Sequence, residues 1–172
     1  MNTPQEDPKT LPEKDSGAEQ ITPEEGPGKI YRRILVATDF SAYATNAFEQ
    51  GLKIAKQNHA ELLIAHSFAW PNDLCFMPSD CYGQWEKKCR TEAEKNMGAL
   101  LEKARKENVK THMLALEGIA DDAIVDVAKR LDVDLIVIAT HGQQKASRFF
   151  WGSVVAHIIS HAPCAVLTVH SP

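Results

Sequence analysis

Two glycines and a serine follow the most apolar run of the chain. Gly142 comes shortly after that run ends at Ala139, and Gly152-Ser153 opens a helical pattern, with nine residues between the glycines. Glycine lets the backbone approach a ligand closely, and the first turn of a helix has N–H groups without an intrahelical partner. Such groups bind anions, and Lys145 and Arg148 between them add positive charge. We therefore expect a phosphate-binding loop.

A second polar segment, Thr38-Asp39-Phe40-Ser41, follows the first apolar run of the domain at residues 34–37. Ser41 suits the N-cap of a helix. Parallel strands bring their carboxyl ends to one edge of a sheet, and ligands bind there at the point where the strand order reverses. We expect the polar segment and the glycine loop to meet at that edge.

These two segments need a sheet to position them. After residue 30, short apolar runs alternate with amphipathic helical patterns, which is typical of β-α-β units. We predict an α/β fold of Rossmann-like type, an open parallel five-stranded sheet in the order 3-2-1-4-5 with helices on both faces. The predicted strands are 34–37, 62–66, 111–116, 135–139 and 165–169. In the third helix, the positions predicted to face inward are Ile119, Ala123, Ile124, Val127 and Ala128.

Residues 1–29 differ in composition from the rest of the chain. They hold five of the nine prolines and seven acidic residues against three lysines, so they carry the whole net charge of -4. We expect a disordered acidic Pro-rich tail at 1–29 and one domain at 30–172. The domain is formally neutral, which disfavours nucleic acid or an anionic membrane as a partner. No apolar run approaches the roughly 20 residues of a membrane span, so we expect a cytoplasmic protein.

The spacing of the glycine loop is also a family motif. The pattern G-x2-G-x9-G-[ST] is matched at Gly142 and Gly152-Ser153, while Ala139 stands at the first glycine. On this motif the chain resembles the ATP-binding members of the universal stress protein family. The resemblance covers about residues 31–170, including the Asp-Phe-Ser turn, His66 at the end of the second strand, and a segment at 161–164 before the last strand.

The resemblance implies an ATP site, with Mg²⁺ as an accompanying ion, and it implies no catalytic residue and no resident metal. Near the base and ribose it places Ala37, Thr38, Asp39, Ser67, Ile138 and Ala139. At the phosphates it places Gly142, Gly152, Ser153 and Val154, and the cofactor-binding set also includes His141, Lys145 and Arg148. The methyl group of Ala139 is either accommodated at the strand end or crowds the ribose.

The resemblance further implies a regulatory nucleotide-binding module in the stress response and a homodimer joined through residues 166–169. The chain lacks the P-loop pattern G-x4-G-K-[ST] and an evident pair of aspartates for magnesium, so we expect slow ATP hydrolysis at most. Two alternatives stay open. One is a dimeric stress protein that works through contacts with another protein without ATP, which Ala139 favours. The other is an adenylate-transferring or flavin-dependent enzyme of the same broad fold.

The cysteines leave two interpretations open. Cys75, Cys81 and Cys89 cluster without a C-x2-C pair, so the spacing typical of a zinc site is absent. They are either reduced thiols of a cytosolic protein or parts of a redox switch.

Overall fold

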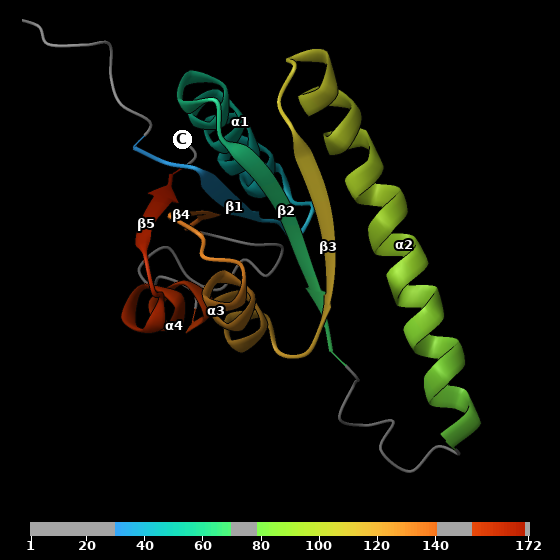
Figure 1. Ribbon diagram of the computed structural model, residues 1–172. Coiled ribbons are helices and arrows are strands. Elements are labelled where there is room, and N and C mark those ends of the chain that lie inside the picture. The colour runs from blue at the N-terminus through green and yellow to red at the C-terminus, as the bar shows by residue number, and fades with distance from the viewer. Residues whose placement is uncertain (1–29, 70–78, 141–152, 171–172) are drawn as a thin grey trace, which may run out of the picture.

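The computed structural model describes residues 30–69, 79–140 and 153–170, in which strands and helices alternate along the chain (Figure 1). The predicted tail at 1–29 and most of the glycine loop lie outside the described residues. The elements are β1 (Arg33–Ala37), α1 (Ala42–Asn58), β2 (Glu61–Phe68), α2 (Ser79–Lys106), β3 (Thr111–Glu117), α3 (Ala120–Arg130), β4 (Leu135–Ala139), α4 (Ser153–His161) and β5 (Ala165–Val169).

All five strands pair in parallel, in the order β3-β2-β1-β4-β5. This order confirms the predicted fold class. On the central strand β1, Ile34 lies opposite Leu62 of β2 on one side and Leu135 of β4 on the other. The strand order reverses between β1 and β4, which makes this the switch point at which ligands bind in open parallel sheets.

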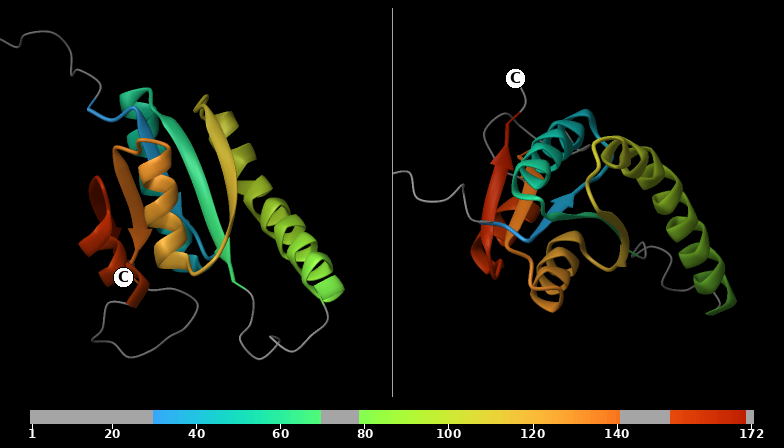
Figure 2. Two further views of the ribbon diagram at one scale, coloured as in Figure 1. Left: turned by 60° about the horizontal axis from the view of Figure 1, so that its bottom comes forward. Right: turned by 45° about the horizontal axis from the view of Figure 1, so that its top comes forward.

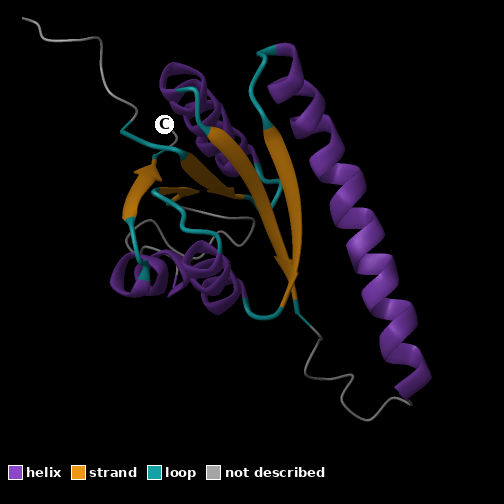
Figure 3. Cartoon of the chain, viewed as in Figure 1, coloured by secondary structure: helices purple, strands orange, loops and turns teal. Residues whose placement is uncertain are grey.

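Helices cover both faces of the sheet, with α1 and α2 on one face and α3 and α4 on the other (Figures 2 and 3). In β1, Ile34 and Val36 pack under α1 and α2, whereas Leu35 and Ala37 pack against α3 and α4. This period of two is typical of a strand buried on both faces. None of the helices in the described ranges is long and apolar enough to span a membrane.

Helix α1 begins where the sequence predicts. The hydroxyl oxygen of Ser41, the N-cap, accepts a hydrogen bond from the backbone N–H of Ala44 at 3.1 Å. Further along the helix, Gly51 faces β1 so closely that a Cβ at this position would overlap Cγ2 of Val36. The missing side chain at residue 51 therefore allows α1 to lie close to the sheet.

The prediction for Ile119 is wrong. Its side chain is 65% exposed, and the residue is the N-cap of α3 with an extended backbone. A residue ahead of the first helical turn does not follow the helical period, so the apolar stripe of the helix does not reach it. The other positions predicted to face inward are buried or half-buried: Ala123, Ile124, Val127 and Ala128.

The thiols on α2 do not form a switch with each other. Cys81 and Cys89 are free, and they stand eight residues apart on one helix. That spacing is about 12 Å of helical rise, well beyond the separation of about 4–7 Å between Cα atoms in a disulfide. Burial raises the pKa of the Cys89 thiol, which lowers its reactivity. Cys75 lies outside the described residues, so a redox role that involves it stays a prediction.

Candidate functional site

The predicted base-binding residues lie where β1 and β2 end. Ala37 lies opposite Ala65 in the register of these strands. Asp39 lies in the turn two residues after Ala37, and Ser67 lies on β2 two residues after Ala65. Both residues are partly exposed, so their polar side chains lie at the open carboxyl edge of the sheet.

The ends of β1 and β4 and the start of α4 share one apolar cluster. Ala37 and Ile138, which are 5% and 8% exposed, belong to the cluster on the α3/α4 face, and Val154 packs against it. Val154 follows Ser153, the first residue of α4. The start of this helix therefore packs on the same face of the sheet as Ala37 and Ile138 at the two central strand ends.

Ala139, which departs from the motif, packs on the opposite face. It belongs to the cluster under α1 and α2 together with Leu135 and Val137, and it is 6% exposed. Its neighbour Ile138 packs on the α3/α4 face, as the alternation of a strand requires. The extra methyl group is therefore added to the core under α1 and not to the face that carries Ile138.

Local hydrogen bonds hold the turn after β1. The N–H of Thr38 donates to the carbonyl of Ala65 at 2.9 Å, which continues the pairing with β2. The hydroxyl oxygen of Thr38 accepts from the N–H of Phe40 at 3.0 Å, and Oδ1 of Asp39 accepts from the N–H of Ser41 at 3.0 Å. Phe40 has a φ of 62°, an unusual value for a residue with a bulky side chain. Together these contacts fix the direction of the Asp39 carboxylate.

His66 supports this turn from β2. Its Nδ1 lies 2.8 Å from the carbonyl oxygen of Thr38, and because a carbonyl only accepts, Nδ1 carries the proton. The imidazole ring also packs against Phe40, with ring centroids 4.4 Å apart. These contacts support a structural role for His66 rather than an acid-base role.

Thr140 is a further candidate site residue, which the sequence analysis did not single out. Its N–H donates to the carbonyl of Val169 at 3.1 Å, and its hydroxyl lies 2.9 Å from Nδ1 of His170. The side chain is 2% exposed. Thr140 therefore joins β4 to β5 directly ahead of the glycine loop. In the sequence, the one feature that could have indicated Thr140 is a hydroxyl residue between a strand and a glycine loop, which is a weak signal of a site residue.

The structure describes eight of the predicted site residues: Ala37, Thr38, Asp39, Ser67, Ile138, Ala139, Ser153 and Val154. All eight lie at the ends of β1, β2 and β4 or at the start of α4. The other five predicted residues lie outside the described residues: His141, Gly142, Lys145, Arg148 and Gly152. Among the described residues, no three His, Cys, Asp or Glu side chains are grouped as a metal site.

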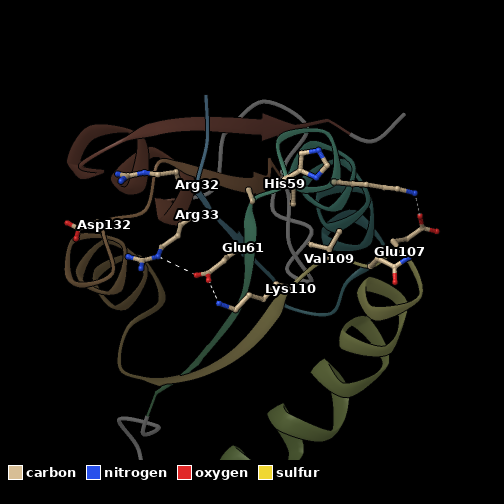
Figure 4. A pocket seen from close by; sticks show the side chains of 12 residues that line it. Arg32, Arg33, His59, Glu61, Glu107, Val109, Lys110 and Asp132 are labelled. Carbon is tan, nitrogen blue, oxygen red and sulfur yellow. Dashed lines mark hydrogen bonds and ion pairs between the residues drawn. The ribbon is translucent and has the colours of Figure 1, made fainter. Parts of the chain in front are cut away.

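A cavity of about 830 Å³ lies at the opposite edge of the sheet (Figure 4). Its lining includes Arg33 and Glu61 from the starts of β1 and β2, and Lys110 from the connection to β3. None of the predicted site residues lines it. The carboxyl edge remains the candidate functional site, because open parallel sheets bind their ligands beyond the carboxyl ends of the strands.

The strand order and the site at the switch point define a Rossmann-like α/β protein. The model of the universal stress protein family matches residues 30–170. The universal stress protein MJ0531 of Methanocaldococcus jannaschii is 30% identical over 146 residues, which cover 83% of this chain and 84% of the relative. The chain therefore belongs to the universal stress protein family, a family of stress-response proteins.

Other relatives agree with this assignment. A Staphylococcus haemolyticus protein that carries the same family name, SH1215, is 33% identical over 144 residues, covering 82% of this chain and 86% of its own. Among solved structures, universal stress protein UspA from Lactobacillus plantarum has a TM-score of 0.66 at 26% identity and covers 81% of this chain and 97% of its own. A family protein from Arabidopsis thaliana, solved with AMP bound, has a TM-score of 0.58 at 20% identity, and the match covers 82% of this chain and 92% of that chain.

Proposed function

We propose that this protein binds ATP at the carboxyl edge of its sheet and that occupancy of the site regulates its contacts with other proteins in the stress response. One observation carries the proposal. Ala37, Ile138 and Val154 share an apolar cluster beside the Asp39 turn, while Ala139, the departure from the motif, packs on the other face of the sheet.

Asp39 and Ser67 are the proposed polar contacts for the adenine base. The hydrogen bond from the backbone N–H of Ser41 fixes the Asp39 carboxylate, and Ser67 lies on β2 two residues after Ala65, the partner of Ala37. Ala37 and Ile138 supply the apolar surface beside them. A largely apolar surface with a few fixed polar groups suits a small organic ligand.

The start of α4 is the proposed phosphate end of the site. Ser153 is exposed at the first position of the helix, where its hydroxyl and the N–H groups of the first turn are suited to an anion. By sequence, Gly142, Gly152 and the other residues of the glycine loop complete this end. A bound nucleotide supplies a flat base and a charged phosphate chain, which together would link the end of β1 to the start of α4.

The Arabidopsis relative with bound AMP supports an adenine nucleotide as the class of ligand. At 20% sequence identity, this relative shows only that the two proteins share a fold. The choice of ligand therefore rests on the residues of this chain, above all on Asp39 and Ser153.

We further propose that the nucleotide acts as a regulatory ligand and is hydrolysed slowly at most, because the chain lacks the P-loop motif. Mg²⁺ would arrive with the nucleotide, and the cytoplasm is the proposed location. The proposed homodimer is joined through β5, which pairs with β4 on one side and is the last strand of the sheet. An apolar edge strand is an aggregation hazard unless it is covered.

Calorimetric titration of the nucleotide-stripped protein with ATP and magnesium tests the proposal. We expect micromolar binding in the wild type. The double variant Gly152→Val with Ser153→Ala should weaken binding at least about tenfold, since charge-assisted hydrogen bonds stabilise by roughly 1.5–3 kcal/mol. Ser160→Ala is a matched control, because that hydroxyl donates to the carbonyl of Ala156 at the other end of α4.

No binding by the folded wild type would reject the proposal. It would favour the ATP-independent dimer, the second candidate, which Ala139 supports by sequence. Equal binding by the double variant and the wild type would place the phosphates elsewhere.

A further inference from the structure

The topology gathers positive charge at the amino edge of the sheet. In a parallel α/β domain each crossover helix ends where the next strand begins, and cations are favourable in the last turn of a helix. Nine cationic residues lie at this edge, in the last turns of α1, α2 and α3 or beside the starts of β1 and β3: Arg32, Arg33, Lys56, Lys103, Arg105, Lys106, Lys110, Lys129 and Arg130. Six carboxylates lie among them or pair with them: Glu49, Glu61, Glu102, Glu107, Asp132 and Asp134.

The cavity at this edge, here called the amino-edge cavity, has an apolar floor and a charged rim (Figure 4). Ala55, Ala60 and Val109 form the floor and are at most 6% exposed. The rim carries ion pairs, among them one between Lys56 and Glu107 at 2.6 Å. The cavity volume of about 830 Å³ falls in the range of roughly 300–1,000 Å³ that ligand pockets occupy.

The cations of the rim can accept new carboxylate partners. The Arg32 guanidinium is 77% exposed, and its ion pair with Asp134 has a separation of 3.7 Å, longer than a hydrogen bond. The side chains of Lys56 and Lys110 are 59% and 67% exposed, and each pairs with one carboxylate. Such exposed pairs stabilise a protein by about 0–1 kcal/mol, so an incoming carboxylate can compete with them.

The acidic segment at 1–29 joins the domain at this same edge. It leads through Ile30 and Tyr31 into Arg32 and Arg33, which both line the cavity. Glu24 and Glu25 are the nearest acidic residues of the segment. Fully extended, the chain from Glu25 to Arg32 spans only about 23 Å. The glycines and proline at 26–28 are residues that favour a chain reversal.

We propose that the acidic segment of this chain, at Ile21–Glu25, occupies the amino-edge cavity. Glu24 and Glu25 pair with Arg32 and with the lysines of the rim, and Ile21 lies on the apolar floor. The ends of the four helices α1 to α4 lie at this edge and add about half a negative charge each, which offsets part of the surplus of cations and leaves the edge positive. Covalent connection adds a high effective concentration to contacts that are individually weak.

This occupant gives the cavity a role that is separate from the nucleotide site. The segment covers the apolar floor and reduces the positive charge of one edge, while the carboxyl edge stays open. Because the contact depends on exposed charges, it weakens as salt rises.

Carbodiimide crosslinking of the full chain, followed by peptide mapping, tests the proposal. Carbodiimide joins a carboxylate to a lysine in direct contact, so we expect links from Glu24 or Glu25 to Lys56 or Lys110. These links should disappear at about 0.5 M salt, at which the Debye length is only a few ångströms. The exposed lysines Lys87, Lys88 and Lys95 on α2 serve as internal controls.

Amide NMR of full-length variants provides a second measurement. Glu24→Gln with Glu25→Gln should shift the amides of Val109 and Lys110, and the matched change Glu6→Gln with Asp7→Asn should not. Three results would overturn the proposal: crosslinks spread evenly over exposed lysines, crosslinks only between chains in a mixture of labelled and unlabelled protein, or no shift at the cavity.

Discussion

Ala139 illustrates that a change in a binding motif must be judged by the direction of its side chain. By sequence, the replacement of the first motif glycine casts doubt on nucleotide binding. In the structure, Ala139 packs under α1, whereas Ile138 packs on the face that carries Ala37. The sequence specifies the replacement, but the direction of the methyl group follows from the strand register.

The variant Ala139→Gly tests whether the methyl group of Ala139 points away from the nucleotide site. We expect the affinity for ATP to change less than about twofold, because the methyl group lies away from the Ile138 face. We expect the free energy of unfolding to fall by about 1–2 kcal/mol, because a buried methyl group is lost and the strand gains backbone entropy in the unfolded state. Calorimetry and urea unfolding measure the two quantities. An affinity gain of tenfold or more would mean that the methyl group crowds the ligand.

Several features of individual residues follow from local sequence. Ser41 is an N-cap as predicted, because capping depends on a few neighbouring residues. Ile119 misled the sequence analysis, because apolar periodicity does not reveal on which residue a helix starts. Thr140 was missed because its partner His170, which directly follows β5, lies 30 residues further along the chain. The two errors thus have different causes, the exact start of a helix for Ile119 and a partner far along the chain for Thr140.

At the scale of elements, Gly51 determines how closely α1 packs on β1. Gly51→Ala would place a methyl group against Val36. We expect the free energy of unfolding to fall by about 1–3 kcal/mol, which is the usual cost of overpacking a core. Gly98 on α2 is the matched control, because a Cβ there meets no other atom within 4 Å. Gly98→Ala should raise stability by about 0.5–1 kcal/mol through helix propensity. If both variants lose stability equally in urea unfolding, the packing argument fails.

Asp134 connects the starts of β1 and β4. Its Oδ2 accepts the backbone N–H groups of Arg32 at 2.7 Å and Arg33 at 2.9 Å. Burial alone would raise the pKa of the Asp134 carboxyl, but the hydrogen bonds from the Arg33 and Arg32 backbone outweigh burial and hold this pKa below its ordinary value. The stabilisation is therefore fully present above the ordinary pKa of about 3.9 and is lost as pH falls through the folded-state pKa.

Asp134→Asn should lower the free energy of unfolding by about 1–2 kcal/mol at pH 7, because two backbone donors lose a charged acceptor. The difference between wild type and variant should shrink as pH falls below about 4, where the carboxyl becomes protonated. Urea unfolding between about pH 3 and pH 7 measures this difference, with the exposed Asp132→Asn as control. A difference that does not change with pH would contradict this role.

At the scale of the whole molecule, the parallel sheet has two chemically different edges. The carboxyl edge holds the Asp39 turn and the start of α4, and the amino edge holds the cavity and the cations of three helix ends. The carboxyl edge could be predicted, because a polar segment follows β1 and a glycine loop follows β4 in the sequence. The cavity could not, because its lining comes from segments as distant as Arg32 and Asp132 and depends on where the helices end.

The edge strand β5 is the proposed dimer interface, and Leu167 is its most suitable test. Its side chain is 36% exposed on a strand that lies at the edge of the sheet. Leu167→Lys should convert a dimer to a monomer in light scattering coupled to size exclusion, since an edge lysine opposes strand pairing. A dimer that persists would place the interface elsewhere, and Ile159→Lys on α4 would test the neighbouring exposed apolar residue.

The most direct test of nucleotide binding at the carboxyl edge is an amide NMR titration of the wild-type protein with ATP and magnesium. We predict saturable shifts at Asp39, Ser67 and Thr140, with the amides of His59 and Val109 in the amino-edge cavity unchanged. Shifts confined to the cavity, or no saturable shift at either edge, would contradict the proposed function.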